Sequence, residues 1–231
     1  TDEIIALARH EWGGSLTTPE LRAAFVTPND PAGAAVLQDA SEKLREHGRS
    51  PTLEGYQSQS RERVWELAAA VWAAVAGRRL IYAEPPASFE SNGQKIRLPS
   101  EVLAQRLATC LDTALLFAAA LEQAGLRPLI CLTKGHALTG VWLQPTTLLG
   151  VTTDDASDLR NSIKLDELIV FETTVVATDP PATFTQAIEL GTQQIREALD
   201  DEFVLALDIR QARTRQITPL PAELTTPAES E

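Results

Sequence analysis

The stretch that decides the fold is TCLDTALLFAAALEQA, residues 109–124. Between Leu111 and Leu121 the only charged residue is Asp112, so apolar side chains cover every face of the helix that this stretch predicts. A helix that is apolar all round is buried. The sequence therefore predicts a buried central helix, with Gly125 in the C-terminal capping position.

The start of this helix carries a cysteine in a chemically special place. Thr109 can cap the free backbone amides, and Asp112, three residues later, resembles the acidic partner of a capping box. Cys110 then occupies the first helical position, where unpaired N–H groups and the helix dipole favour a thiolate. Cys110 is thus a candidate nucleophile. The alternative is a small, buried and inert hydrophobic residue.

The next stretch, GLRPLICLTKGHALTGVWL (125–143), predicts two strands around a tight KG turn. Cys131 lies among apolar neighbours in the first strand and is expected to be a packed residue. Gly135 precedes His136 and would allow close approach of another backbone. By the two-residue period of a strand, one face of the second strand carries His136, Leu138, Gly140 and Trp142.

His136 becomes a candidate catalytic residue when it is considered together with Cys110. A lone strand histidine is usually a surface residue or a satisfied core residue. A buried helix that opens with cysteine, followed by two strands with histidine at the start of the second, is how a Cys–His pair is assembled from distant sequence. The imidazole would remove the thiol proton, and a carboxylate would orient the imidazole.

The carboxylate is expected from the stretch LIVFETT, residues 168–174, which predicts a strand. Glu172 is an acid inside an otherwise apolar strand, which is costly unless the acid is paired. The alternative for Glu172 is a solvent-facing glutamate. Asp154 and Asp155 in TTDDASD are further candidates, although that stretch is more typical of a solvated loop or a helix start.

These residues resemble a known family. RLATCLDTALLFAAALEQAGL, KGHALTGVWL and VFETT together resemble transglutaminase-like (papain-related) cysteine protease domains, in which a cysteine at a helix start is followed by a histidine and an acid on strands. There is also a narrower resemblance, to the transglutaminase-like segment that is fused to superfamily-one helicases in large bacterial proteins. The stretches that carry it are TPNDP, GYQS, PPASFE, GQKIRLPSE and PLP. The chain departs from the family in having Glu for the usual Asp and a long separation, 172 − 136 = 36 residues, with 144–167 as an apparent insertion.

The resemblance implies a catalytic triad of Cys110, His136 and Glu172. It also implies an oxyanion hole formed by the Cys110 backbone N–H and one side chain. Gln94 is favoured for that side chain over Gln105, which lies on a predicted helix and is expected to face solvent. Three further residues are expected to support the site: Thr109, Asp112 and Trp142.

The predicted fold class is α+β, with a transglutaminase-like or papain-like core of a central buried helix packed on an antiparallel sheet. The expected division is a helical N-terminal extension at 1–55, the cysteine-nucleophile domain at 56–215 and a linker or tail at 216–231. In the N-terminal part, we expect a short amphipathic helix around His10 and Trp12 and helix starts at Thr18 and Asp30. Further helices are expected at 60–77 and near 182–199. Further strands are expected at 79–83 and 203–209.

Composition limits the classes of function. The formal net charge is −12 and the only basic stretch is RQARTR at 210–215, which argues against direct nucleic-acid binding. No apolar run reaches the ~20 residues of a membrane span, so no membrane contact is expected. Two cysteines without a disulfide framework indicate a cytoplasmic, reducing location. The absence of methionine leads us to expect a segment of a longer protein.

No cofactor and no metal are expected, because two Cys and three His do not offer a zinc ligand set and the glycine-rich nucleotide loops are missing. The expected function is thiol-dependent acyl transfer, with peptide or isopeptide hydrolysis first and amine transfer second. The expected partners are a protein or peptide substrate and other domains of the parent chain. The resemblance implies that one of those domains is a helicase and that the parent protein acts in antiphage defence. The alternatives are a non-catalytic protein-interaction module that retains the fold and a pseudoenzyme that only binds peptide.

Overall fold

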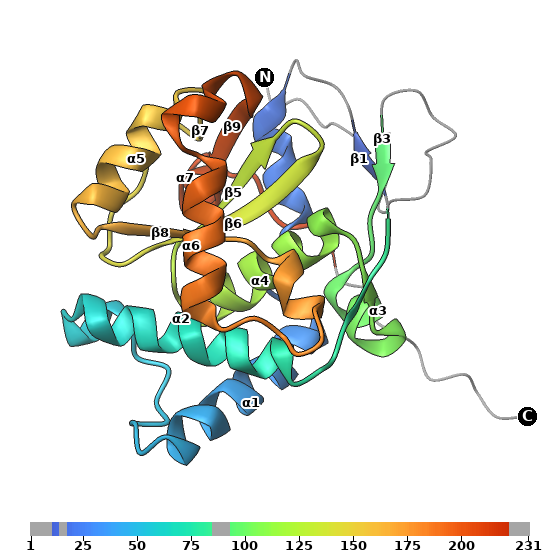
Figure 1. Ribbon diagram of the computed structural model, residues 1–231, viewed down its shortest axis with the longest axis vertical. Coiled ribbons are helices and arrows are strands. Elements are labelled where there is room, and N and C mark those ends of the chain that lie inside the picture. Colours follow the sequence, from blue (N-terminus) through green and yellow to red (C-terminus); the bar gives the residue numbers. More distant parts are fainter. Residues whose placement is uncertain (1–10, 14–17, 85–92, 222–231) are drawn as a thin grey trace, which may run out of the picture.

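The computed structural model describes residues 11–13, 18–84 and 93–221, and it has a mixed architecture of helices and one main antiparallel sheet (Figure 1). The α+β prediction is therefore confirmed. The α-helices are α1 (Pro31–Glu46), α2 (Arg61–Ala76), α3 (Pro99–Gln105), α4 (Cys110–Gln123), α5 (Ala156–Lys164), α6 (Phe184–Gln194) and α7 (Ile209–Thr214). Short 3₁₀ helices are η1 (Pro19–Phe25), η2 (Tyr56–Ser58), η3 (Thr174–Ala177) and η4 (Glu197–Glu202).

The main sheet has the strand order β7-β9-β5-β6-β8, and every neighbouring pair in it is antiparallel. Its strands are β5 (Pro128–Thr133), β6 (His136–Trp142), β7 (Thr152–Thr153), β8 (Leu168–Phe171) and β9 (Phe203–Asp208). Two small sheets lie outside it. One pairs β1 (Glu11–Gly13) with β3 (Gly93–Lys95), and the other pairs β2 (Ile81–Tyr82) in parallel with β4 (Leu107–Ala108).

Helix α4 is the centre of the molecule, as Figure 1 shows, and every residue from Cys110 to Leu121 is buried. One side of α4 packs with α1 and α2, and another packs against β5, β6 and β9. The opposite face of the sheet is covered by α5, against which Leu138 and Trp142 pack. The prediction of a buried central helix on an antiparallel sheet is confirmed, and its apolar surface on all sides is explained by packing in several directions.

Aromatic side chains join the helices to the end of the sheet. The Trp72 ring of α2 stacks on Phe117 of α4 with ring centroids 5.2 Å apart. Phe171, the last residue of β8, meets Phe117 edge to face at 5.5 Å and Phe184 of α6 at 5.2 Å. Such aromatic pairs have a preferred geometry and bury a large area. These contacts hold Phe171, and with it the end of β8, in place against α4 and α6.

The N-terminal region is only partly as predicted. Helical starts at Thr18 and Asp30 are confirmed, and the Asp30 carboxylate accepts a hydrogen bond from the N–H of Ala32 at 2.9 Å. The helix expected around Trp12 is wrong, because Glu11–Gly13 is a strand paired with β3. That pairing partner is about eighty residues away in the sequence, so local helical periodicity did not reveal it. His10 lies outside the described residues.

Several boundaries differ from the sequence-based expectations. The strand expected at 168–174 ends at Phe171, and the chain then continues into η3, which begins at Thr174. The helix expected near 182–199 is two elements, α6 and η4. The segment 144–167 contains β7 and α5, and the Asp155 carboxylate caps α5 by accepting a hydrogen bond from the N–H of Ser157 at 2.8 Å.

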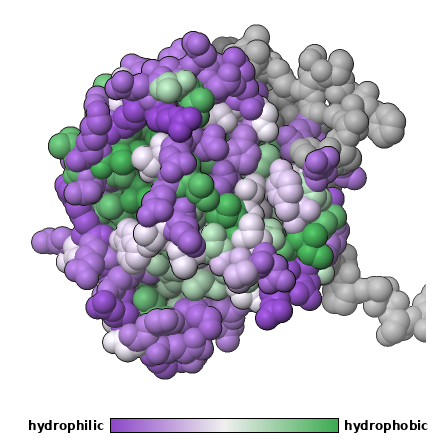
Figure 2. All heavy atoms as spheres, in the orientation of Figure 1, coloured by the Kyte–Doolittle hydropathy of each residue, from purple (hydrophilic) through white to green (hydrophobic). Residues whose placement is uncertain are grey.

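The surface is mostly polar on the face seen in Figure 2, with apolar residues in small separate patches. Among the described residues, no helix has both the length and the apolar character that crossing a bilayer requires.

Candidate active site

The candidate site lies where three elements begin or end: Cys110 opens α4, His136 opens β6, and Glu172 follows the last residue of β8. The expected capping box at Cys110 is present. The Thr109 hydroxyl accepts a hydrogen bond from the N–H of Asp112 at 3.2 Å, and the Asp112 carboxylate accepts one from the N–H of Thr109 at 3.0 Å. Cys110 is therefore held at the first position of the helix, at the positive end of the helix dipole.

Asp112 also ties the start of α4 to the segment after β3. Its carboxylate accepts hydrogen bonds from the backbone N–H of Arg97 at 2.7 Å and from Arg97 Nη1 at 3.0 Å. The Asp112 side chain is fully buried, and the guanidinium supplies the opposite charge that a buried carboxylate needs. Asp112 thus joins the start of α4 to Arg97, a partner that the sequence did not reveal.

His136 follows the turn between β5 and β6. Gly135 has φ +73°, a left-handed conformation that glycine adopts without strain, and no atom of the described residues lies within 4 Å of where its Cβ would be. The expectation that Gly135 permits close approach of another backbone is therefore wrong, because the glycine serves the turn itself. The turn directs the chain back along β5, and it leaves His136 at the end of the sheet next to the start of α4.

Glu172 is the carboxylate that meets His136. Its Oε2 lies 2.6 Å from His136 Nε2. Its Oε1 accepts hydrogen bonds from the Thr174 backbone N–H at 2.9 Å and from the Thr174 hydroxyl at 2.7 Å. The residue is only 6% exposed, so both carboxylate oxygens are satisfied within the protein.

The position of Glu172 corrects one part of the sequence-based argument. Glu172 does not lie inside an apolar strand, because the strand ends one residue earlier. Its backbone N–H donates to the carbonyl of Ala187 in α6 at 2.9 Å, so α6 rather than the sheet ladder holds it. A glutamate that starts from beyond the strand end still reaches the imidazole because its side chain is one methylene longer than that of aspartate.

The electrostatics of the site favour an imidazolium. Hydrogen bonds with Cys110 and then with Glu172 raise the pKa of His136 to about 10. Burial alone would raise the pKa of Glu172, but the hydrogen bonds from His136 and Thr174 outweigh it, and that pKa lies below its usual range. Because Glu172 occupies Nε2, Nδ1 is the ring nitrogen left for the Cys110 sulfur. A thiol, an imidazole and a carboxylate are thus connected in that order.

Tyr82 is a site residue that sequence reasoning missed. Strand β2 pairs with β4, and Ala83 N–H donates to the Ala108 carbonyl at 2.9 Å, just before Cys110. Burial raises the pKa of the Tyr82 phenol, and the neighbouring Cys110 and Glu172 raise it further. Tyr82 is 43% exposed, so it neighbours Cys110 and also contacts solvent. Strand 79–83 was expected, but no sequence spacing connects it with Cys110.

The glutamine candidates differ in their surroundings. Gln94 lies on β3, and its Nε2 is buried with no hydrogen-bond partner among the residues the structure describes. Gln105 is exposed at the end of α3 and accepts a hydrogen bond from Arg97 Nε at 3.3 Å, so its expected solvent-facing position is confirmed. Asp154 and Asp155 are exposed at the start of α5, and the carboxylate that bonds His136 is Glu172 instead.

Trp142 has no part in the site, contrary to the expectation. It is the last residue of β6, and the strand rises about 3.3 Å per residue, which puts it roughly 20 Å from His136. Its Nε1–H donates to the buried Asp208 carboxylate at 3.1 Å. Asp208 also accepts from the Leu148 N–H at 2.9 Å and from the Gln211 N–H at 2.9 Å, where it caps α7. Trp142 therefore stabilises the opposite end of the sheet.

Cys131 differs from Cys110 in its place in the fold, since it lies within a strand rather than at the start of a helix. It is completely buried in β5, and burial raises the pKa of its thiol to about 12. The expectation of a packed residue is confirmed. In the described ranges, no group of three or more His, Cys, Asp or Glu side chains is arranged to hold a metal ion.

Comparison with known proteins gives no assignment: no family model, no curated protein and no solved structure matches the chain.

Proposed function

We propose that the chain is a thiol-dependent acyl-transfer domain of the transglutaminase-like type, with Cys110 as nucleophile, His136 as acid and base, and Glu172 as the group that orients the imidazole. The observation that carries the proposal is the 2.6 Å contact of His136 Nε2 with Glu172 Oε2, while Cys110 is the largest cause of the raised pKa of the same ring. Nucleophile, base and orienting acid in that order are what covalent catalysis at an acyl group needs.

The proposed reaction begins with the Cys110 thiolate, which attacks the carbonyl carbon of an amide. The carbonyl oxygen becomes an oxyanion, and the C–N bond breaks when imidazolium His136 gives its proton to the departing amine. An acyl-thioester on Cys110 remains. Water then attacks the thioester carbonyl while His136 accepts the water proton. The C–S bond breaks, the carboxylic acid leaves, and the Cys110 thiolate and His136 imidazolium are restored. An amine in place of water would give transfer instead of hydrolysis.

The oxyanion needs a donor beside the Cys110 backbone N–H. Tyr82 and Gln94 are the two candidates. The Tyr82 hydroxyl is a hydrogen-bonding neighbour of Cys110, and the Gln94 amide nitrogen has no partner in the described part of the chain. Tyr82→Phe and Gln94→Leu remove one donor each. The variant whose acylation rate falls by about 10²–10³ identifies the oxyanion donor.

A protein or peptide is the proposed substrate class, and the proposed parent is a helicase-fused protein, by resemblance to the family. A non-catalytic module that retains the fold is the second candidate. The observation that favours it is the burial of Cys110, which is only 4% exposed.

Alkylation of Cys110 by iodoacetamide across pH separates the two candidates. If the chain is an enzyme, we expect the alkylation rate of Cys110 to rise with pH with an apparent pKa well below ~8.5. In His136→Gln, this rise at low pH should disappear. Cys131 is an internal control, since its complete burial should leave it unlabelled in the folded protein. An unreactive Cys110, or a profile that His136→Gln does not change, would favour the module. Incubation with a peptide thioester then tests for a Cys110-linked acyl group by intact-mass measurement.

A further inference from the structure

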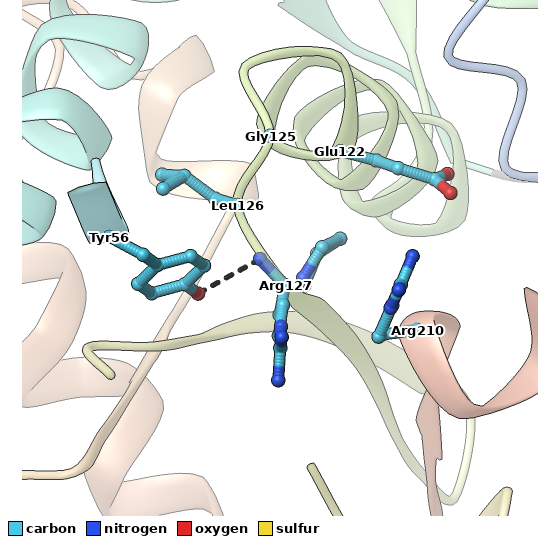
Figure 3. A pocket seen from close by; sticks show the side chains of 7 residues that line it. Tyr56, Glu122, Gly125, Leu126, Arg127 and Arg210 are labelled. Carbon is cyan, nitrogen blue, oxygen red and sulfur yellow. Dashed lines mark hydrogen bonds between the residues drawn. The ribbon is translucent and has the colours of Figure 1, made fainter. Parts of the chain in front are cut away.

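A second site is suggested by a cavity at the other end of α4. The cavity has a volume of about 380 Å³ and lies beside the C-terminus of α4, the start of β5 and the first turn of α7 (Figure 3). Helix α4 has 14 residues and is therefore about 21 Å long, so this cavity is well separated from Cys110. Its lining residues are Tyr56, Glu122, Gly125, Leu126, Arg127, Pro128 and Arg210.

Among the described residues that line the cavity, Glu122 is the one carboxylate, and its charge is already neutralised. Glu122 Oε1 accepts a hydrogen bond from Arg213 Nε at 2.8 Å, and Glu122 Oε2 accepts one from Arg213 Nη2 at 2.9 Å. The remaining Arg213 donors are used too, because they bond to the carbonyls of Ala23, Val26 and Ile217. This bidentate pair cancels the charge of Glu122 and fixes Arg213 in the structure.

Arg127 and Arg210 have no such neutralisation. The Arg127 guanidinium lies 5.6 Å from the Tyr56 ring centroid and donates to the Thr146 carbonyl at 3.2 Å, and neither partner carries negative charge. The Arg210 side chain is exposed, and within 18–84 and 93–221 it forms no ion pair or hydrogen bond. Figure 3 shows Arg127 between Tyr56 and Arg210 in this view. Two like charges thus line one cavity in a chain of net charge −12.

We propose that this cavity binds a small molecule bearing a phosphate group, with Arg127 and Arg210 as its cationic donors. Two unneutralised guanidiniums match the charge of a phosphate dianion, whereas a monocarboxylate would leave one of them uncompensated. Planar guanidinium groups bind phosphate oxygens in a bidentate manner. The Tyr56 ring, Leu126 and Pro128 supply apolar walls, and the volume lies at the lower end of the range for small-molecule pockets.

Tyr56 prepares the cavity by holding its two sides together. Its hydroxyl donates to the Trp142 carbonyl at 2.8 Å and accepts from the Arg127 backbone N–H at 3.0 Å. The backbone of Arg127 is therefore fixed before any ligand arrives, and the ligand has to order only the ends of the arginine side chains. A pre-ordered site binds more tightly because less conformational freedom is lost.

The test is a titration of the whole chain with inorganic phosphate and with glycerol 3-phosphate, followed by the amide NMR signals around Arg127 and Arg210 at constant ionic strength. We expect saturable shifts, and Kd values raised about tenfold in Arg127→Gln and in Arg210→Gln. Arg210 is exposed, so its substitution should leave folding intact. Arg79→Gln is the matched control, since Arg79 is exposed and lies beyond the far end of α2 from Tyr56.

The outcomes decide the proposal directly. No saturable shift in the wild-type chain, or equal Kd values in all three variants and the wild type, would overturn it. Acetate bound as tightly as phosphate would overturn the assignment of a dianion. If phosphate binds, the ratio of the two Kd values tells whether the site takes free phosphate or an ester. None of these results depends on the reactivity of Cys110.

Discussion

At the scale of single residues, the candidate site depends on how one buried glutamate is satisfied. Glu172 is almost completely buried, yet its two oxygens meet His136 and Thr174, so burial does not leave an unpaired charge. His136 in turn has a carboxylate on one ring nitrogen and the Cys110 sulfur as its other neighbour. Cys110 makes the largest contribution to the raised pKa of His136, and the charge of Glu172 raises that pKa further.

Glu172→Gln tests this dependence. Glutamine keeps a hydrogen-bonding side chain of the same length but removes the negative charge, so we expect the pKa of His136 to fall by about 1–3 pH units. The measurement is an NMR titration of the His136 imidazole signals. Glu202→Gln is the control, because Glu202 is exposed and its carboxylate pairs with Lys134 at 3.6 Å rather than with His136. An unchanged titration of His136 in Glu172→Gln would contradict the assigned role.

At the scale of elements, the capping box of α4 both starts the helix and places the cysteine. The same motif starts α6, where the Thr183 hydroxyl accepts a hydrogen bond from the N–H of Gln186 at 3.3 Å. The two caps differ in location, since Thr109 is buried beside Cys110 and Thr183 is exposed away from it. Substitutions of these two threonines can therefore be compared, to distinguish the effect of a helix cap on stability from its effect on the site.

Thr109→Ala and Thr183→Ala should each lower the free energy of unfolding by about 1 kcal/mol, because each leaves helix N–H groups without their acceptor. Only Thr109→Ala should also change the rate at which iodoacetamide labels Cys110, because only that cap fixes the backbone of the cysteine. Urea denaturation gives the stability and mass spectrometry gives the labelling rate. Equal labelling rates in both variants would show that the cap does not position Cys110.

At the scale of the whole molecule, the site makes stability depend on pH. The pKa of His136 is about 10 in the folded protein against an ordinary 6.5 in the unfolded chain. A histidine with a raised folded-state pKa stabilises the fold fully below the unfolded pKa, and this contribution is lost as the pH rises through the folded pKa. The ionised Glu172, whose pKa lies below its usual range, is present throughout that interval.

The difference in unfolding free energy between wild type and His136→Gln should therefore shrink from about pH 7 to about pH 10. Urea denaturation at intervals across that range measures the difference. His47→Gln is the control, because His47 is exposed at the end of α1 and its imidazole bonds to the Lys43 carbonyl rather than to a carboxylate. A difference that stays constant with pH would mean that His136 is not held as an imidazolium in the folded protein.

The sequence by itself determined the central helix, its cap and the cysteine at its start, because capping residues and an apolar surface on all sides are local features of 109–124. It also determined the turn before His136 and the packing of Cys131. The α+β class followed from those elements. These features depend on residues within a few positions of one another, so they can be predicted from the amino-acid sequence alone.

Only the tertiary structure decided how the pieces meet. Strand β8 ends before Glu172 because α6 binds the Glu172 backbone, and β2 brings Tyr82 to Cys110 through pairing with β4. Trp142 lies at the opposite end of β6 from His136, where its indole N–H donates a hydrogen bond to Asp208. Each of these contacts joins segments that are dozens of residues apart, and the free energy that selects them comes from burial and hydrogen bonding between elements, which local periodicity does not encode.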